Sequence, residues 1–308
     1  MDAAMRMGIV VALVTAMLQS GSYVLSRMFF SKGYTSMQLV FAAQMVIMLV
    51  SIIAWPFVVR GVDVFRPEVM AWMGLTTGGY MLGQCFWLNA MRKIEASRIA
   101  SLYGIKILFV GLLYMLLLHN GGLSIYMFVG VFMAVSAVAL MNYQRGGSFS
   151  MVGMVPLGLA IVGFSFSDIG AVGMMPALDM ESRVSAAIVS TLCNNILAGL
   201  LLLPFWKKIG FEWKQMPCSA PYALCYLVSV MSIFYCFSVL DPVYTNVIVA
   251  IRGIFSLLLG WLLARLGYTA LESRATRVEW LRRGAAATLM FAAIVVYSYG
   301  KIRIQNIG

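Results

Sequence analysis

Two basic residues lie deep inside apolar segments of this chain, where an ionised side chain is unfavourable unless it faces a partner or a polar cavity. Lys106 and Arg252 each stand about ten residues inside their segment. Two cations that converge on one cavity would bind a carboxylate or phosphate group strongly. Alternatively, each neutralises an internal acid such as Asp168 or extends its charge to the membrane interface. The pair therefore predicts an anion site, with a structural ion pair as the competing interpretation.

The spacing of these residues indicates an internal duplication. Residues 94–106 (IEASRIASLYGIK) and 240–252 (LDPVYTNVIVAIR) each begin with an aliphatic residue and an acid and end with Ile and a base. Glu95 and Asp241 are 146 residues apart, and so are Lys106 and Arg252. Equivalent positions of inverted repeats surround a pseudo-twofold axis, where transporters usually build their binding site.

Other polar residues inside apolar segments are candidates for the same cavity. Asp168 is either a proton-coupling carboxylate or the counter-ion of Lys106 or Arg252, and the sequence leaves both open. Asn194 and Asn195 are adjacent amides, and unpaired polar groups cost several kcal/mol in hydrocarbon. We expect at least one to face the cavity or a neighbouring helix. The remaining candidates for the substrate lining are Tyr103, Thr245, Asn246, Gln84 and Tyr23. Glu95 and Asp241 stand at helix starts, where a carboxylate caps the helix dipole.

The composition excludes a soluble globular domain. Of the 308 residues, 62% are hydrophobic and 11% are charged, whereas soluble domains are about a quarter charged. The net charge of +11 would suggest nucleic acid as a partner in a soluble protein. In a membrane protein, basic loops set the orientation, so we expect no nucleic-acid partner and take the lipid bilayer as the surroundings.

The apolar segments predict an all-α integral membrane protein with ten transmembrane helices. We expect spans at residues 6–29, 36–58, 69–91, 96–118, 122–142, 151–173, 184–206, 218–239, 243–264 and 284–300. Residues 1–148 would form the first five-helix repeat and residues 149–308 the second. Because five is odd, the second repeat enters the membrane from the opposite face and is inverted.

The distribution of basic residues predicts an orientation. The loops after the odd-numbered spans hold 14 of the 22 Lys and Arg residues, and the termini and other loops hold 6. By the positive-inside rule the odd-numbered loops are cytoplasmic and both termini lie outside. The longest connection, 265–283, is either an amphipathic surface helix or a polar loop.

No sequence signature of an enzyme is present. The chain has no P-loop, no HExxH and no Gly-x-Ser-x-Gly motif, and its single histidine and five cysteines have no metal-ligand spacing. We therefore expect no catalytic residues, no metal and no cofactor. Without an ATP site, transport would be secondary, by exchange or ion coupling.

Ten helices in two inverted repeats, with the loop and Ala-Ser-rich helix around 90–118, resemble the drug/metabolite transporter superfamily of the EamA-like, ten-helix type. A narrower likeness is to its nucleotide-sugar and triose-phosphate translocator branch. Members of that branch carry an Asn-Asn pair in the seventh helix, matched by Asn194-Asn195, and a substrate-binding base in the ninth, matched by Arg252. The Phe-Tyr before the Asn pair is Leu192-Cys193 here. The branch usually keeps its termini cytosolic, in contrast to the charge distribution.

The predicted function is secondary transport of a small organic anion, phosphorylated or carboxylated, by alternating access. Lys106 and Arg252 would bind the anionic group, Asn194 and Asn195 the rest of the substrate, and Asp168 would couple or balance charge. An alternative is an amino-acid or drug exporter of the same superfamily, in which the basic residues pair with internal acids. A third is a membrane receptor or enzyme that transports nothing. We expect a bacterial inner membrane, and the sequence leaves the oligomeric state open.

Overall fold

The structure is a computed structural model that describes residues 3–59, 61–91, 106–118, 124–142, 151–252, 255, 258–259, 262 and 277–305. Every regular element in these ranges is a helix. The composition explains this result, because a backbone in apolar surroundings has no water to bond and must satisfy its N–H and C=O groups internally.

Each described helix of eight or more residues overlaps one of the ten predicted segments, and several extend beyond its bounds. They are α1 (Ala3–Phe30), α2 (Ser36–Val58), α3 (Pro67–Met91), α5 (Lys106–Leu118), α6 (Ile125–Asn142), α7 (Met151–Ala177), α8 (Arg183–Leu202), η1 (Leu203–Phe205), α9 (Trp206–Ile209), α10 (Gln215–Val239), α11 (Pro242–Val249) and α13 (Arg277–Gln305). Within the described ranges, five stretches are long and apolar enough to cross a membrane: α1, α2, α7 from Met154, α8 through α9, and α10. The protein is therefore helical with several membrane-capable helices.

Local sequence sets the helix ends. Thr35 and Gln38 form a capping box at the start of α2. Asp241 caps α11 by accepting a hydrogen bond from the Tyr244 backbone N–H at 2.7 Å, which confirms the capping role predicted for it. Gly210 ends α9 with a φ of 70°, a conformation that glycine adopts without steric cost.

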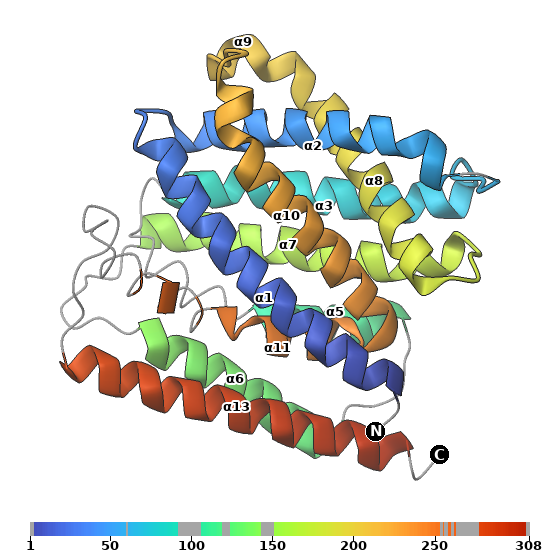
Figure 1. Cartoon of the computed structure of the whole chain (residues 1–308). Helices are drawn as coiled ribbons and strands as arrows, with labels where there is room; N and C mark the ends of the chain where they lie inside the picture. Colours follow the sequence, from blue (N-terminus) through green and yellow to red (C-terminus); the bar gives the residue numbers. More distant parts are fainter. Residues whose placement is uncertain are drawn as a thin grey trace.

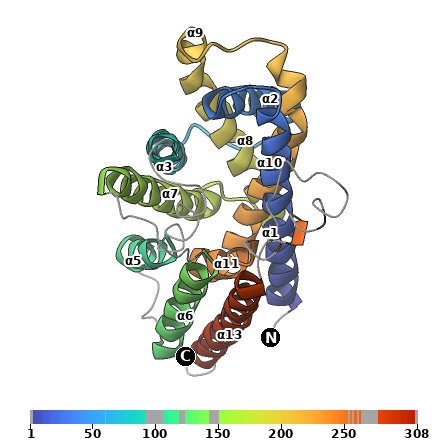
Figure 2. The same cartoon turned by 90° about the vertical axis from the view of Figure 1, so that its left-hand side faces the viewer.

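The helices form two layers (Figure 2). One layer contains α3, α7 and α5, and the other contains α1 and α10, with α2 and α8 at one edge and the α6–α13 pair at the opposite edge. The two termini lie at the same end of the molecule (Figure 1). The closest approach is between α3 and α7, where a Cβ added to Gly79 would lie 2.7 Å from the Gly163 carbonyl oxygen.

One element differs from its prediction. The segment expected to be a continuous helix over 243–264 is interrupted, because α11 ends at Val249 and residues 250–251 form a turn. The Ile251 N–H bonds to the Ile248 carbonyl at 3.1 Å, one residue short of the helical pattern. Arg252 follows directly. The connection expected at 265–283 lies outside the described residues as far as 276, and α13 begins at Arg277.

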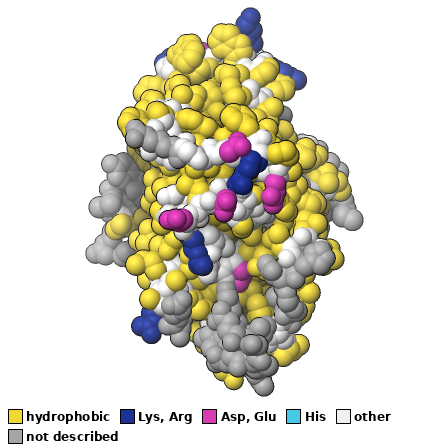
Figure 3. Space-filling model, turned by 90° about the vertical axis from the view of Figure 1, so that its right-hand side faces the viewer, with side chains coloured by type: hydrophobic (Ala, Val, Ile, Leu, Met, Phe, Trp, Pro, Cys, Tyr) yellow, Lys and Arg dark blue, Asp and Glu magenta, His cyan; other side chains and the backbone are white. Residues whose placement is uncertain are grey.

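The outer surface is largely apolar, and the charged side chains gather at the helix ends. Figure 3 shows acidic and basic side chains together on the end of the molecule where α2 leads to α3 and α7 leads to α8. The residues of this end are Asp63, Arg66, Glu68, Asp179, Glu181 and Arg183. An apolar belt bounded by charged ends is the surface expected of a protein in a bilayer.

Candidate functional site

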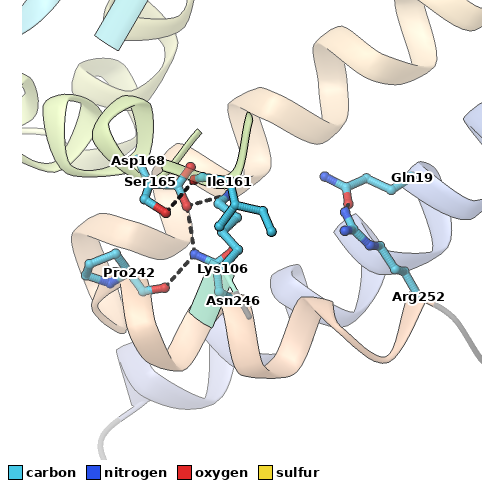
Figure 4. A network of polar contacts seen from close by, with 8 residues as sticks. All are labelled: Gln19, Lys106, Ile161, Ser165, Asp168, Pro242, Asn246 and Arg252. Carbon is cyan, nitrogen blue, oxygen red and sulfur yellow. Dashed lines mark hydrogen bonds and ion pairs between the residues drawn. The ribbon is translucent and has the colours of Figure 1, made fainter. Parts of the chain in front are cut away.

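The structure joins three of the predicted site residues in one polar network (Figure 4). Lys106, the first residue of α5, places its Nζ 2.8 Å from Oδ2 of Asp168, in the middle of α7. The Asn246 side chain of α11 donates from Nδ2 to the same oxygen at 2.8 Å. Asn246 Nδ2 also donates to the Pro242 carbonyl at 2.8 Å. The carboxylate therefore holds α5, α7 and α11 together.

The burial of this network explains its pairing. The Lys106 and Asp168 side chains are 10% and 13% exposed. An isolated charge so far from water would be strongly unfavourable, and a close pair with an additional hydrogen bond relieves most of that cost. Both contacts of Asp168 are made through Oδ2, so among the described residues Oδ1 has no partner. Oδ1 is therefore left to accept a hydrogen bond from a ligand.

Arg252 forms a second polar contact, on α1. Its Nη1 donates to Oε1 of Gln19 at 2.7 Å, as Figure 4 shows. Its carbonyl oxygen accepts from the Ser20 hydroxyl at 2.8 Å. The residue stands immediately after the break that ends α11. The Gln19 amide orients the guanidinium group and adds no negative charge.

Lys106 and Arg252 thus make corresponding contacts. Lys106 binds α7, the first helix of the second predicted repeat, and Arg252 binds α1, the first helix of the first. The contacts differ in charge, because α7 supplies a carboxylate to Lys106 and α1 supplies an amide to Arg252.

The adjacent asparagines of α8 bind neighbouring helices. Asn194 Oδ1 accepts from the Thr77 hydroxyl of α3 at 2.6 Å. Asn195 Nδ2 donates to the Thr191 carbonyl at 2.8 Å, and Gln44 of α2 donates to the Asn195 carbonyl at 3.0 Å. Both asparagines are buried. Their hydrogen bonds within the described ranges join α2, α3 and α8, and do not reach Lys106 or Arg252.

The remaining candidates are dispersed. Thr245 is fully buried and donates to the Asp241 carbonyl of its own helix at 2.7 Å. Gln84 is half-buried and hydrogen-bonds Tyr80. Tyr23 belongs to α1, but the structure does not describe its side chain, and Tyr103 and Glu95 lie outside the described residues. The described residues contain no cluster of three or more His, Cys, Asp or Glu side chains that could hold a metal.

Sequence reasoning missed a pair of tyrosines between the two layers. Tyr80 of α3 and Tyr226 of α10 are joined by a side-chain hydrogen bond. The Tyr80 ring lies 6.4 Å from the ring of Phe164 of α7, which lies 6.1 Å from Trp87. A signal was present in the sequence, because Tyr80 and Tyr226 are 146 residues apart, the interval that separates Lys106 from Arg252.

Comparison with known proteins establishes a shared fold. No family model matches the chain, and no curated protein matches it. Among the solved structures 28 chains are similar to it. One of them, described only as the crystal structure of a protein, superimposes with a TM-score of 0.66 and 15% identity over 97% of this chain and 99% of its own length. At that identity the likeness concerns the fold alone.

Proposed function

We propose that this protein is a secondary transporter of ten spans that moves a small organic anion across a membrane by alternating access. Residues 1–148 and 149–308 would be its two inverted repeats. The resemblance to the drug/metabolite transporter superfamily and the bacterial inner membrane belong to the same proposal.

The observation that carries this proposal is the paired pattern of helix contacts. If α1, α2, α3, α5 and α6 correspond to α7, α8, α10, α11 and α13, the main contacts should recur with the roles exchanged; the α8–α10 contact is an exception, because α2 and α3 scarcely touch. The α3–α7 contact recurs as α10–α1, the α5–α7 contact as α11–α1, and the α2–α10 contact as α8–α3. Each of the pairs α2–α8, α5–α11 and α6–α13 joins a helix to its own counterpart. This pattern supports a pseudo-twofold axis, about which the two halves can exchange conformations.

The basic residues support an anionic substrate. Arg252 presents a planar, permanently charged guanidinium group next to a broken helix and is oriented by the neutral Gln19 amide. Broken helices inside a membrane occur where the backbone is buried in protein or lines a water-filled cavity, and the second case would give a substrate access to Arg252. Lys106 would join Arg252 in binding the anion when the substrate displaces Asp168 from its ammonium group. The displaced Asp168 carboxylate would keep its hydrogen bond from Asn246 but lose its counter-ion.

Uptake into proteoliposomes tests this proposal. A thermal-shift screen of nucleotides, nucleotide sugars, sugar phosphates and carboxylates would first select the stabilising anion. Wild type and Lys208→Gln, a control at an exposed lysine of α9, should then accumulate that radiolabelled anion. Arg252→Gln should lower the initial rate by about tenfold or more, because it removes charge-assisted hydrogen bonds. Wild-type uptake no faster than that of protein-free liposomes would overturn the proposal.

The Lys106–Asp168 pair favours a second candidate function, export of an amino acid or a drug. In that case the ion pair stays formed throughout the transport cycle, and the Lys106 ammonium group does not bind the substrate. Replacing both residues, Lys106→Gln with Asp168→Asn, removes the pair without leaving a lone charge. Retained transport of neutral or cationic compounds by this double variant would support the exporter. Loss of anion uptake in the double variant would support the first proposal.

A further inference from the structure

Aromatic side chains from three helices meet between the two layers. Tyr80 and Trp87 come from α3, Phe164 from α7 and Tyr226 from α10. Tyr226 also stacks on Tyr222 with ring centroids 6.0 Å apart. The Phe164 ring lies directly over Gly83, where an added Cβ would stand 2.7 Å from a ring carbon. The absence of a side chain at Gly83 thus lets this ring lie against α3.

Tyr80 and Tyr226 mark the centre of this arrangement. They occupy equivalent positions in the two proposed repeats and hydrogen-bond to each other. Two equivalent residues in mutual contact must lie next to the pseudo-twofold axis that relates them. Substrates of inverted-repeat transporters bind beside that axis.

The rings also keep part of their surface accessible. Tyr80, Phe164 and Tyr226 are each half-buried, although they come from three different helices that pack together. Rings that lie between the layers and remain partly exposed leave aromatic surface that a ligand can contact.

The cluster of aromatic rings lies next to the Lys106–Asp168–Asn246 network along α7. Phe164 precedes Asp168 by one turn of α7, so the two side chains share a face of the helix. Asp168 holds Lys106 and Asn246. A ligand between the layers therefore meets rings from α3, α7 and α10 at one end and the Lys106 ammonium group at the other.

We propose that the transported anion carries a planar aromatic ring, bound against Tyr80, Phe164 and Tyr226, with its acidic group directed to Lys106. This inference rests on the proposed function and specifies its substrate class. Aromatic faces and edges attract one another beyond the area that they bury. A saturated ring of similar size buries the same surface and lacks that attraction, so the site selects the aromatic member of a matched pair.

The test is a thermal-shift titration of the purified full chain with two matched pairs of anions. Benzoate is compared with cyclohexanecarboxylate, and phenyl phosphate with cyclohexyl phosphate, so that both acidic groups are covered. In wild type the aromatic member of at least one pair should bind about three- to tenfold more tightly. Phe164→Leu and Tyr226→Leu, on different helices, should each reduce that preference to less than about twofold. Phe132→Leu, a 70% exposed position on α6, should leave it unchanged.

Three outcomes overturn the inference, and they bear differently on transport. Equal affinity for both members of each pair, with binding lost in Arg252→Gln, contradicts the aromatic site and leaves an anion transporter. A lack of response to all four compounds also contradicts the aromatic site, and the uptake assay then decides separately whether the protein transports another anion. A preference that survives in both leucine variants places the ring elsewhere and likewise overturns the assignment.

Discussion

The ammonium group of Lys106 lies 2.8 Å from the carboxylate of Asp168, and this ion pair joins α5 to α7 inside an apolar protein. The residue at the equivalent position of the second proposed repeat, Arg252, donates to the Gln19 amide of α1. Under the proposed duplication, a carboxylate of α7 contacts Lys106 whereas an amide of α1 contacts Arg252, so the two contacts differ in charge. We expect this difference to determine which side of the protein opens more readily.

Removal of Asp168 should destabilise the protein. Asp168→Asn leaves the Lys106 ammonium group buried without its partner, and breaking a buried pair costs about 3 kcal/mol or more. The measurement is thermal unfolding in detergent, with Lys106→Gln added to Asp168→Asn as the rescue. The double variant should regain most of the lost stability because neither residue then carries a charge.

The exposed pair between Lys214 and Glu212 provides the control. These side chains are 68% and 55% exposed and their charges lie 2.5 Å apart. Since exposed ion pairs contribute little, Glu212→Gln should unfold at the wild-type temperature. An Asp168→Asn protein as stable as wild type would show that the buried pair is not structural.

A carboxylate at residue 19 should disable anion transport. Gln19→Glu places a negative charge where the amide now accepts from Arg252 at 2.7 Å, and so gives Arg252 the kind of partner that Lys106 has. We expect anion affinity to fall by about tenfold or more, because the substrate must then compete with a fixed carboxylate. Unfolding temperature should remain equal or rise, which separates this effect from misfolding. Wild-type affinity in Gln19→Glu would remove Arg252 from the binding site.

The sequence predicted the helices better than their contacts. Length and hydropathy placed α2 at residues 36–58, as found, since a segment in hydrocarbon has few alternatives to a helix. The 146-residue interval singled out Lys106 and Arg252, but it could not choose between Asp168 and a substrate as the partner of Lys106. That choice depends on how helices distant in sequence pack. The break after α11 was also missed, because Ala250 and Ile251 are not residues that ordinarily end a helix.

The pair Tyr80 and Tyr226 shows the same limit of prediction from sequence. Tyr80 and Tyr226 are two of 14 tyrosines, and each alone is typical of a packed aromatic side chain in a membrane protein. Only their 146-residue spacing distinguishes them. The Asn194–Asn195 pair shows the opposite case, because two adjacent amides in an apolar segment suggested substrate binding whereas their hydrogen bonds join α8 to α2 and α3. A role for this pair in binding substrate stays a prediction.

Close packing of α3 on α7 should not tolerate a single added methyl group. A Cβ at Gly79 would lie 2.7 Å from both the Gly163 carbonyl oxygen and the Ser167 backbone nitrogen, and backbone atoms cannot move aside cheaply. We expect Gly79→Ala to cost about 1–3 kcal/mol of stability. The matched control is Gly78→Ala, the neighbouring residue, whose Cβ would meet nothing within 4 Å. The measurement is the thermal unfolding temperature of the two variants. Equal unfolding temperatures would contradict the close α3–α7 contact.

The charges at the two ends of the molecule predict its orientation. Exposed Lys207, Lys208 and Lys214 gather at one end. There the Gln38 side chain, in the first turn of α2, donates to the Gly210 carbonyl of the α9–α10 connection at 3.0 Å. Asp63, Glu68, Asp179 and Glu181 stand at the opposite end with both termini. Positively charged loops stay in the cytoplasm, so we expect the acidic end and the termini to face outward.

Two glutamates at opposite ends allow a matched test of this orientation. Glu181 and Glu212 are both exposed, so a cysteine at either site in a cysteine-free background is accessible to a maleimide that cannot cross membranes. Glu181→Cys should be labelled in intact cells, and Glu212→Cys only after the cells are permeabilised. The reverse pattern would place the termini in the cytoplasm, as in the transporter branch that this chain resembles. The basic loops would then lie outside, against the rule that orients most membrane proteins.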